Sequence, residues 1–427
     1  MPRLNGALGL AAILWAVALS AADPASAGNS LCALREGPRG PCTCKDDDNP
    51  AGQFSVVDKG LCKGATQSSK GAKRADKAAK STEGNSEGGT AQSAEPQSAV
   101  AGVSATSDKA SLSRKLDEVR ARGKLLCGVN TGLLGFASQS ESGVWAGLDA
   151  DFCRAVAAAA LGDAAKAEFV PVETNERFDA LKSGKIDVLA RNTTWTMGRE
   201  VDLGVKFTGV LYYDGQGFMT SDDRGFVSAQ QLAGSKICVE AGTTTEANMA
   251  FFFKSHGIEA QTLVFPARDE MLKAYAEGAC DTYSADRSAL FSDRASFSEP
   301  EKHAILPEVI SKEPLGPAVP QGDVEWEEIV AWTLAGLINA EEVGIDKRIA
   351  GAPDPLSGDQ QRLVDGAGVS GEKLRLSKTW LRDVVAAVGN YGEMYEGNVG
   401  KGSALGMERG LNALWKRGGI MIAPPMW

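Results

Sequence analysis

The chain contains a stretch in which short apolar runs alternate with amphipathic segments. Leu125 to Val129, Phe169 to Val172 and Ile186 to Leu189 are brief apolar runs bounded by polar or glycine-containing turns, as in buried strands. The segments between them carry apolar residues at helical spacing and end at Gly162 and Gly184, and glycine commonly ends a helix. This β-α-β-α-β alternation predicts a parallel sheet covered by helices.

The same alternation restarts about forty residues later. The predicted strands are Lys236 to Val239, Thr262 to Phe265 and Cys280 to Tyr283, and the helices between them end at Gly257 and Gly278. Two units of this kind predict an α/β chain with two lobes and a cleft between them.

Polar residues follow the predicted strands of the first lobe where a cleft is expected. Ligands of open α/β sheets bind beyond the carboxyl ends of the strands. Asn130 follows the first strand there, and Thr194 and Arg199 follow the third. A planar guanidinium can hold a carboxylate through two parallel hydrogen bonds, although a solvated surface arginine is the alternative.

The second lobe offers a complementary set of polar residues. Gly242, Thr243 and Thr244 begin a helix, and Thr243 with Glu246 is predicted to form a capping box. The N–H groups at such a helix start can hold a carboxylate, and capping alone is the alternative. Asp286 follows the last strand and can accept hydrogen bonds from an ammonium group. Opposite charges on two lobes fit a zwitterionic ligand.

Two extended segments are expected to connect the lobes, at Tyr212 to Met219 and at the proline-rich Glu313 to Pro320. An amphipathic helix is expected at Trp326 to Glu341, and helical patterns at Leu376 to Val388 and Leu405 to Trp415 are expected to cover the first lobe. The predicted limits are residues 111–215 with 318–427 for the first lobe and 216–317 for the second.

The first 110 residues lack this alternation. Residues 1–27 have a positive start at Arg3, a short apolar run at Leu8 to Leu19 and an A-x-A site, which predicts a cleaved signal peptide and a periplasmic protein. An uncleaved membrane anchor is the alternative. Residues 64–110 are rich in Ala, Ser, Gly, Lys and Glu and predict a disordered linker.

Residues 28–63 form a small cysteine-rich segment. Cys32, Cys42, Cys44 and Cys62 lie in a stretch with few apolar residues, where disulfides would replace a core. A metal site at Cys42 and Cys44 is the alternative, although these cysteines lack the spacing of common zinc sites. We expect no metal and no cofactor.

Composition agrees with an exported protein that does not bind nucleic acid. The 45 Lys and Arg residues are outnumbered by 55 Asp and Glu residues, and no long basic run is present. The number of cysteines, 8, is even. Within the lobes, Cys127 can pair with Cys153 and Cys238 with Cys280, whereas buried free thiols are the alternative. The second pair requires the first strand of that lobe to lie beside the third.

Several motifs, taken together and in order, resemble the periplasmic amino-acid-binding proteins of ABC importers, and the general L-amino-acid receptor branch most of all. The motifs are GVNTGLLGF, GLDADFCRAVA, RFDALKSGKIDVLARNTTWTMGR, FTGVLYYDGQGFMT, VEAGTTTE, GACDTYSAD, ISKEPLGPAV and AVGNYGEMYEGNVG. The resemblance covers Ser111 to Trp427. It implies a two-lobed periplasmic-binding-protein type II fold. It also implies a monomer that binds an L-amino acid and delivers it to the permease subunits of an inner-membrane ABC transporter.

The resemblance also assigns expected roles at individual positions. Arg199 would hold the α-carboxylate of the ligand and Asp286 its α-ammonium group. The supporting contacts would come from Thr194, the backbone of Asn192, the loop Gly242, Thr243 and Thr244, and Asn130. The sequence departs from the branch at Arg287, where an uncharged residue is usual, and at Pro320, where a basic residue is common.

The main alternative is an enzyme, because periplasmic dehydratases share this fold. Catalysis needs a positioned acid or base, yet His256 and His303 lie away from the predicted strand ends. Asp286 remains a candidate general base under this alternative. A structural or sensory role of the N-terminal segment is a further possibility.

Overall fold

The computed structural model describes residues 114–427 and, before them, the backbone of three short strands. These are β1 (Cys32–Leu34), β2 (Cys42–Lys45) and β3 (Phe54–Val57), which form an antiparallel sheet in the order β1-β2-β3. The chain divides into two units, residues 1–100 and 101–427. The predicted signal peptide, the linker and the pairing of the N-terminal cysteines lie outside the described residues.

The first sheet of the larger unit has five strands in the order β7-β4-β8-β17-β9. They are β4 (Leu125–Val129), β7 (Ala167–Pro171), β8 (Val188–Leu189), β9 (Val205–Phe207) and β17 (Ala318–Pro320). The strand β4 is parallel to β7 and β8, whereas β17 is antiparallel to its neighbours. The predicted parallel sheet therefore contains one antiparallel strand, β17, which returns late in the sequence and lies between β8 and β9.

The second sheet also has five strands, in the order β13-β12-β14-β11-β15. They are β11 (Gln216–Ser221), β12 (Lys236–Glu240), β13 (Gln261–Phe265), β14 (Thr282–Asp286) and β15 (His303–Ile305). The strand β12 is parallel to β13 and β14, and β11 is antiparallel to β14 and β15. In each β-α-β-α-β segment the first strand lies beside the third, β4 beside β8 and β12 beside β14. The predicted Cys238–Cys280 pairing requires this order.

A two-stranded ribbon connects the two sheets. Its strands, β10 (Tyr212–Asp214) and β16 (Glu313–Leu315), are antiparallel, with Asp214 opposite Glu313. The chain leaves the first sheet after β9 and returns to it at β17, passing through this ribbon in each direction. We call the first sheet with its helices the first lobe and the second sheet with its helices the second lobe.

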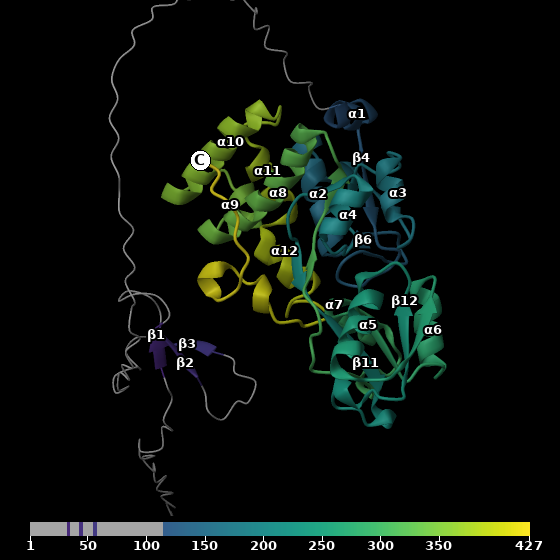
Figure 1. Ribbon diagram of the computed structural model, residues 1–427. Coiled ribbons are helices and arrows are strands. Elements are labelled where there is room, and N and C mark those ends of the chain that lie inside the picture. Colours follow the sequence, from purple (N-terminus) through teal and green to yellow (C-terminus); the bar gives the residue numbers. More distant parts are fainter. Residues whose placement is uncertain (1–31, 35–41, 46–53, 58–113) are drawn as a thin grey trace, which may run out of the picture. The chain divides into compact units, whose positions relative to one another are not determined.

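Helices cover both sheets (Figure 1). Those of the first lobe are α1 (Arg114–Arg122), α2 (Leu148–Leu161), α3 (Arg177–Lys182) and α4 (Met197–Leu203). Those of the second are α5 (Thr244–His256), α6 (Arg268–Ala276) and α7 (Arg287–Ser296).

The C-terminal helices pack on the first lobe, as expected. Figure 1 shows them grouped near α2, and their buried residues share one core with it. They are α8 (Val324–Val343), α9 (Lys347–Gly351), α10 (Gly358–Lys373), α11 (Trp380–Val388) and α12 (Tyr391–Asn398). The predicted helix at Leu405 to Trp415 is wrong, because Gly406 and Gly410 adopt positive φ angles of 59° and 48° that interrupt a helix.

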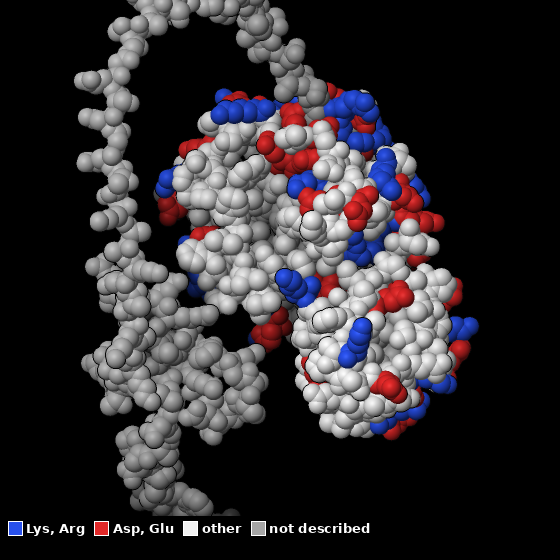
Figure 2. Space-filling model, in the orientation of Figure 1, with Lys and Arg blue, Asp and Glu red and all other residues white. Residues whose placement is uncertain are grey.

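Charged side chains of both signs lie on the surface of the described residues (Figure 2). On the face drawn in Figure 2, acidic and basic side chains lie together in groups, and uncharged surface lies between these groups. Among residues 114–427, no helix has the length and apolar character needed to span a membrane.

Each lobe contains one disulfide. Cys127 on β4 is bonded to Cys153 on α2, with Cα atoms 6.0 Å apart, and Cys238 on β12 is bonded to Cys280, with Cα atoms 5.8 Å apart. All four sulfur-bearing side chains are buried. Each bond therefore holds a strand to a neighbouring element of its own lobe.

Removing the second disulfide should destabilise the protein without changing its fold. The bond spans 42 residues of sequence, and a loop of that size stabilises a folded chain by about 2 to 4 kcal/mol through the unfolded state. We expect the Cys238→Ala/Cys280→Ala variant to lose this amount in urea denaturation. Under a reducing agent the wild type loses this bond as well, so the difference in stability that is due to the bond should disappear. An unchanged midpoint under oxidising conditions would contradict the bond.

Candidate functional site

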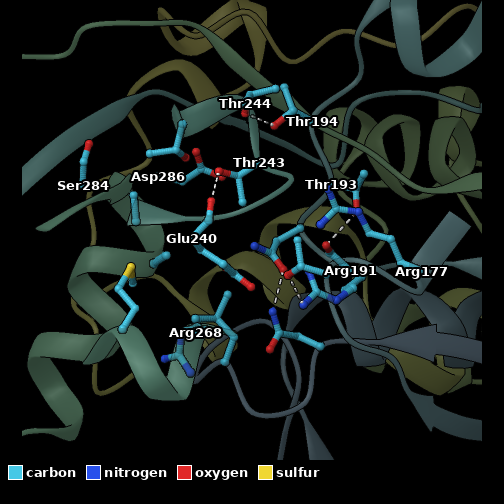
Figure 3. Close-up of a pocket in the computed structure, with 18 of the residues that line it drawn as sticks. Arg177, Arg191, Thr193, Thr194, Glu240, Thr243, Thr244, Arg268, Ser284 and Asp286 are labelled. Carbon is cyan, nitrogen blue, oxygen red and sulfur yellow. Dashed lines mark hydrogen bonds between the residues drawn. The ribbon is translucent and has the colours of Figure 1, made fainter. Parts of the chain in front are cut away.

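One cavity lies where the two lobes face each other, and it encloses about 620 Å³ counted to its open mouth. Figure 3 shows side chains from both lobes around it, including Arg177 and Arg191 from the first and Glu240, Arg268 and Asp286 from the second. The predicted residues that line it are Asn130, Asn192, Thr194, Arg199, Thr243, Thr244 and Asp286. Gly242 contributes its carbonyl, which accepts from Arg177 Nη2 at 3.4 Å.

The loop after β8 is fixed by hydrogen bonds within the first lobe. Asn192 has a φ of 35°, which non-glycine residues rarely adopt. Its N–H donates to Asp149 Oδ2 at 2.8 Å, and its Oδ1 accepts from Asn130 Nδ2 at 3.0 Å. Asp149 lies in the first turn of α2, and burial raises its pKa to about 6. These bonds hold the loop in place without a ligand.

Arg199 lies in the first turn of α4, beside the loop after β8. Its backbone N–H donates to the Thr196 hydroxyl, which caps the helix, and its Nη1 donates to the Thr194 carbonyl at 2.7 Å. Burial lowers the pKa of Arg199, while Asp286 and Glu313 oppose this shift. Among the described residues, its other guanidinium donors have no hydrogen-bond partner, so they remain available to an anion.

The start of α5 is built differently from the prediction. The capping box is wrong, because the Thr243 hydroxyl donates to the Glu240 carbonyl at 2.7 Å and does not cap the helix. The Thr244 hydroxyl donates to Glu313 Oε2 at 3.0 Å and lies 3.4 Å from the Thr194 hydroxyl. The first turn of α5 therefore touches the first lobe and leaves N–H groups uncapped by Thr243.

Asp286 ends β14 and is one of the acidic residues that line the cavity. Its Oδ1 is buried and has no hydrogen-bond partner among the described residues. Burial, and after it the nearby Asp214 and Glu313, raise the pKa of Asp286 well above its ordinary value, and Arg199 and Arg177 oppose this shift. A ligand cation at this oxygen would supply the missing partner.

The two departures from the family pattern do not line the cavity. Arg287 Nη1 donates to the Leu306 carbonyl at 2.8 Å, so this guanidinium is held within the second lobe. Pro320 ends β17, opposite Val205 of β9.

The histidines also lie outside the cavity lining. His256 Nδ1 lies 2.9 Å from the Phe252 carbonyl, and His303 Nδ1 lies 2.9 Å from the Tyr275 hydroxyl. Both contacts are within the second lobe, so neither imidazole is placed to act on a molecule in the cavity.

Sequence reasoning missed several charged residues of the cavity, namely Arg177, Arg191, Glu240, Arg268 and Asp293. Arg177 could have been found, because it follows the polar segment after β7, which is also the carboxyl end of a strand. Arg268 and Asp293 form an ion pair, and Asp293 also accepts from the Tyr283 hydroxyl at 2.8 Å. That pair forms through tertiary packing, and no local sequence pattern predicts it.

The sequence profile of the bacterial extracellular solute-binding proteins, family 3, matches residues 125–346. The chain belongs to this family. Members similar to it include the general L-amino acid-binding periplasmic protein AapJ of Rhizobium johnstonii. That protein is 48% identical over 332 residues, which cover 76% of this chain and 96% of AapJ.

Two further relatives extend the comparison. The glutamate/glutamine/aspartate/asparagine-binding protein BztA of Rhodobacter capsulatus is 46% identical over 73% of this chain and 92% of BztA. A solved periplasmic binding protein of an ABC transporter from Brucella ovis, with glutathione bound, is 46% identical and has a TM-score of 0.69. It covers 73% of this chain and 99% of its own. These relatives are matched over almost their whole length.

The buried Asp149 predicts how stability responds to pH in this family 3 protein. Its pKa in the folded chain, about 6, exceeds the ordinary 3.8, so the folded state binds this proton more tightly than the unfolded state. The resulting penalty is present above pH 6 and disappears as the pH falls through 6 and towards 4. The Asp149→Asn variant should therefore gain about 1 to 3 kcal/mol over the wild type at pH 8.

That gain should shrink towards zero at pH 4, as measured by urea denaturation without ligand. Asp269→Asn, which alters an exposed side chain (89% accessible) on α6, is the control and should show no such trend. A difference between Asp149→Asn and the wild type that does not vary with pH would contradict the raised pKa.

Proposed function

We propose that this chain captures an L-amino acid between its lobes in the periplasm and delivers it to the permease of an inner-membrane ABC transporter. The observation that carries the proposal is the arrangement of charge in one cavity. Arg199 of the first lobe keeps free donors, and Asp286 of the second keeps a buried oxygen without a partner. The names of the relatives AapJ and BztA support the same ligand class.

The zwitterionic part of the ligand would use the residues that sequence comparison suggested. Its α-carboxylate would bind the Arg199 guanidinium, the Thr194 hydroxyl and the N–H groups at the start of α5, near Thr244. Its α-ammonium group would bind Asp286. Asn130, the backbone of Asn192, Gly242 and Thr243 would complete the contacts. This assignment matches each charged ligand group with a side chain of the opposite charge.

Binding would favour the closed arrangement of the lobes, because the two ends of the ligand are held by different lobes. A ligand that binds one conformation more tightly shifts the population towards it. The ribbon of β10 and β16 connects the lobes and is the expected place for the change in backbone angles. The permease would then distinguish the closed, loaded form from the open one.

Other expectations belong to the same proposal. A cleaved signal peptide at residues 1–27, a monomeric chain and lobe limits at residues 215–216 and 317–318 fit a periplasmic receptor. We propose binding without catalysis, because among the described residues no histidine lines the cavity. Turnover of prephenate or arogenate by the purified protein would contradict this part.

A thermal-shift screen of the full chain tests the ligand class. The twenty L-amino acids and glutathione would be added separately, since a relative contains bound glutathione. A ligand that binds only the folded state raises the midpoint of unfolding. We expect a rise with several L-amino acids and none with their D-enantiomers. A screen without any shift, repeated by calorimetry without heat, would overturn the proposal.

Substituting either charged residue should abolish tight binding. Arg199→Ala or Asp286→Ala leaves one charged group of the ligand buried without its partner, which costs about 2 to 5 kcal/mol. We expect affinity measured by calorimetry to fall by at least about 30-fold for every ligand. Asp202→Ala, an exposed position on the helix of Arg199, is the control and should bind as the wild type does. Wild-type affinity in Arg199→Ala or Asp286→Ala would contradict the assignment.

A further inference from the structure

We propose that Arg177 forms a subsite for the ligand side chain and selects L-amino acids whose side chain ends in a carbonyl oxygen. Amides would bind more tightly than carboxylates because Glu240 lines the same cavity. The inference rests on the proposed amino-acid function and names the ligand class within it.

Arg177 is buried with a hydrogen-bonding group left over. The residue is 4% exposed, and its Nε has no hydrogen-bond partner among the described residues. Its one hydrogen bond to a described residue is long, 3.4 Å from Nη2 to the Gly242 carbonyl. A buried donor without a partner is unfavourable, so a ligand acceptor that reaches this Nε–H would be stabilised.

The neighbouring Arg191 shows what a purely structural arginine looks like in this cavity. It is 5% exposed, nearly the same as Arg177. Its Nε donates to the Val172 carbonyl and its Nη2 to the Thr174 hydroxyl, both at 2.8 Å. Arg191 is therefore occupied in holding the segment after β7 to the end of β8, whereas Arg177 keeps a donor for a ligand. Arg268 Nε also has no partner among the described residues, but that guanidinium is ion-paired with Asp293.

Arg177 lies close enough to the proposed carboxylate site to be reached by one amino acid. The guanidinium carbons of Arg177 and Arg199 lie 5.0 and 5.6 Å from the centre of the same ring, Phe178. The two guanidinium carbons are therefore at most about 11 Å apart, and both side chains line the same cavity. We infer that a ligand whose α-carboxylate is held by Arg199 extends its side chain towards Arg177.

Glu240 gives this subsite an acceptor as well as a donor. It ends β12 in the second lobe, is half-buried, and its carboxylate makes no hydrogen bond with the described residues. It interacts electrostatically with both Arg177 and Arg191. An amide can accept from Arg177 and donate to Glu240 at the same time. A carboxylate is attracted by the arginines but cannot donate to Glu240, whose charge offsets part of that attraction, and an ammonium group cannot accept from Arg177.

Calorimetry with L-glutamine, L-glutamate and L-alanine tests the subsite. In the wild type we expect the order glutamine, glutamate, alanine, from tightest to weakest. Arg177→Gln should weaken glutamine binding relative to alanine binding by about 10- to 100-fold, as expected when one buried hydrogen bond is lost. The ratio is used because Arg177 also touches Gly242 across the cavity, and any effect on lobe closure changes all three affinities alike.

Two further variants sharpen the test. Arg177→Lys keeps the charge but removes Nε–H, so it should lose most of the same ratio and guard against a variant that fails to fold. Glu240→Gln should raise the affinity for glutamate relative to glutamine. Arg294→Gln removes another arginine that stacks on a phenylalanine, with its guanidinium carbon 4.9 Å from the ring centre of Phe291, and should change neither ratio.

If folded Arg177→Gln keeps the wild-type ratio of glutamine affinity to alanine affinity, whether or not all three affinities fall, the subsite is overturned and the amino-acid function remains. An unchanged glutamate-to-glutamine ratio in Glu240→Gln would overturn the preference for amides. A wild-type chain that binds none of the three would overturn the proposed function, and the subsite with it.

Discussion

The structure depends on two partly buried groups of opposite charge, Arg199 and Asp286, that are held apart from each other. Arg199 and Asp286 line the same cavity, but each belongs to a different lobe and no ion pair joins them among the described residues. Burial lowers the pKa of Arg199 and raises that of Asp286, so each charge is held in a place that disfavours it. This separation is maintained by the elements that carry the two residues, α4 in the first lobe and the end of β14 in the second.

Sequence predicted the fold because it follows from local order along the chain. Strand-helix alternation fixes which strand ends share a cleft, and Asp286 at the end of β14 and Arg199 in the helix after β8 both line the cavity there. The capping box failed because the Thr243 hydroxyl found a competing acceptor in the Glu240 carbonyl. Arg177 and Arg191 look alike in sequence, and only the packed structure shows that Nε of Arg191 has a hydrogen-bond partner while Nε of Arg177 has none among the described residues.

The proposed arrangement assigns two tasks to different parts of the cavity. The groups common to all amino acids would meet Arg199 and Asp286, whereas the variable side chain would meet Arg177 and Glu240, which carry opposite charges themselves. A side chain that can both accept and donate a hydrogen bond would match that second pair best.

The position of the two disulfides has a consequence for motion. One bond joins β4 to α2 and the other joins β12 to Cys280, two residues before β14 begins, so each lies inside one lobe and neither crosses the ribbon of β10 and β16. The covalent cross-links therefore make each lobe stiffer without tethering one lobe to the other. Formation of the two disulfides can therefore stiffen each lobe while the angle between the lobes stays free of any covalent cross-link.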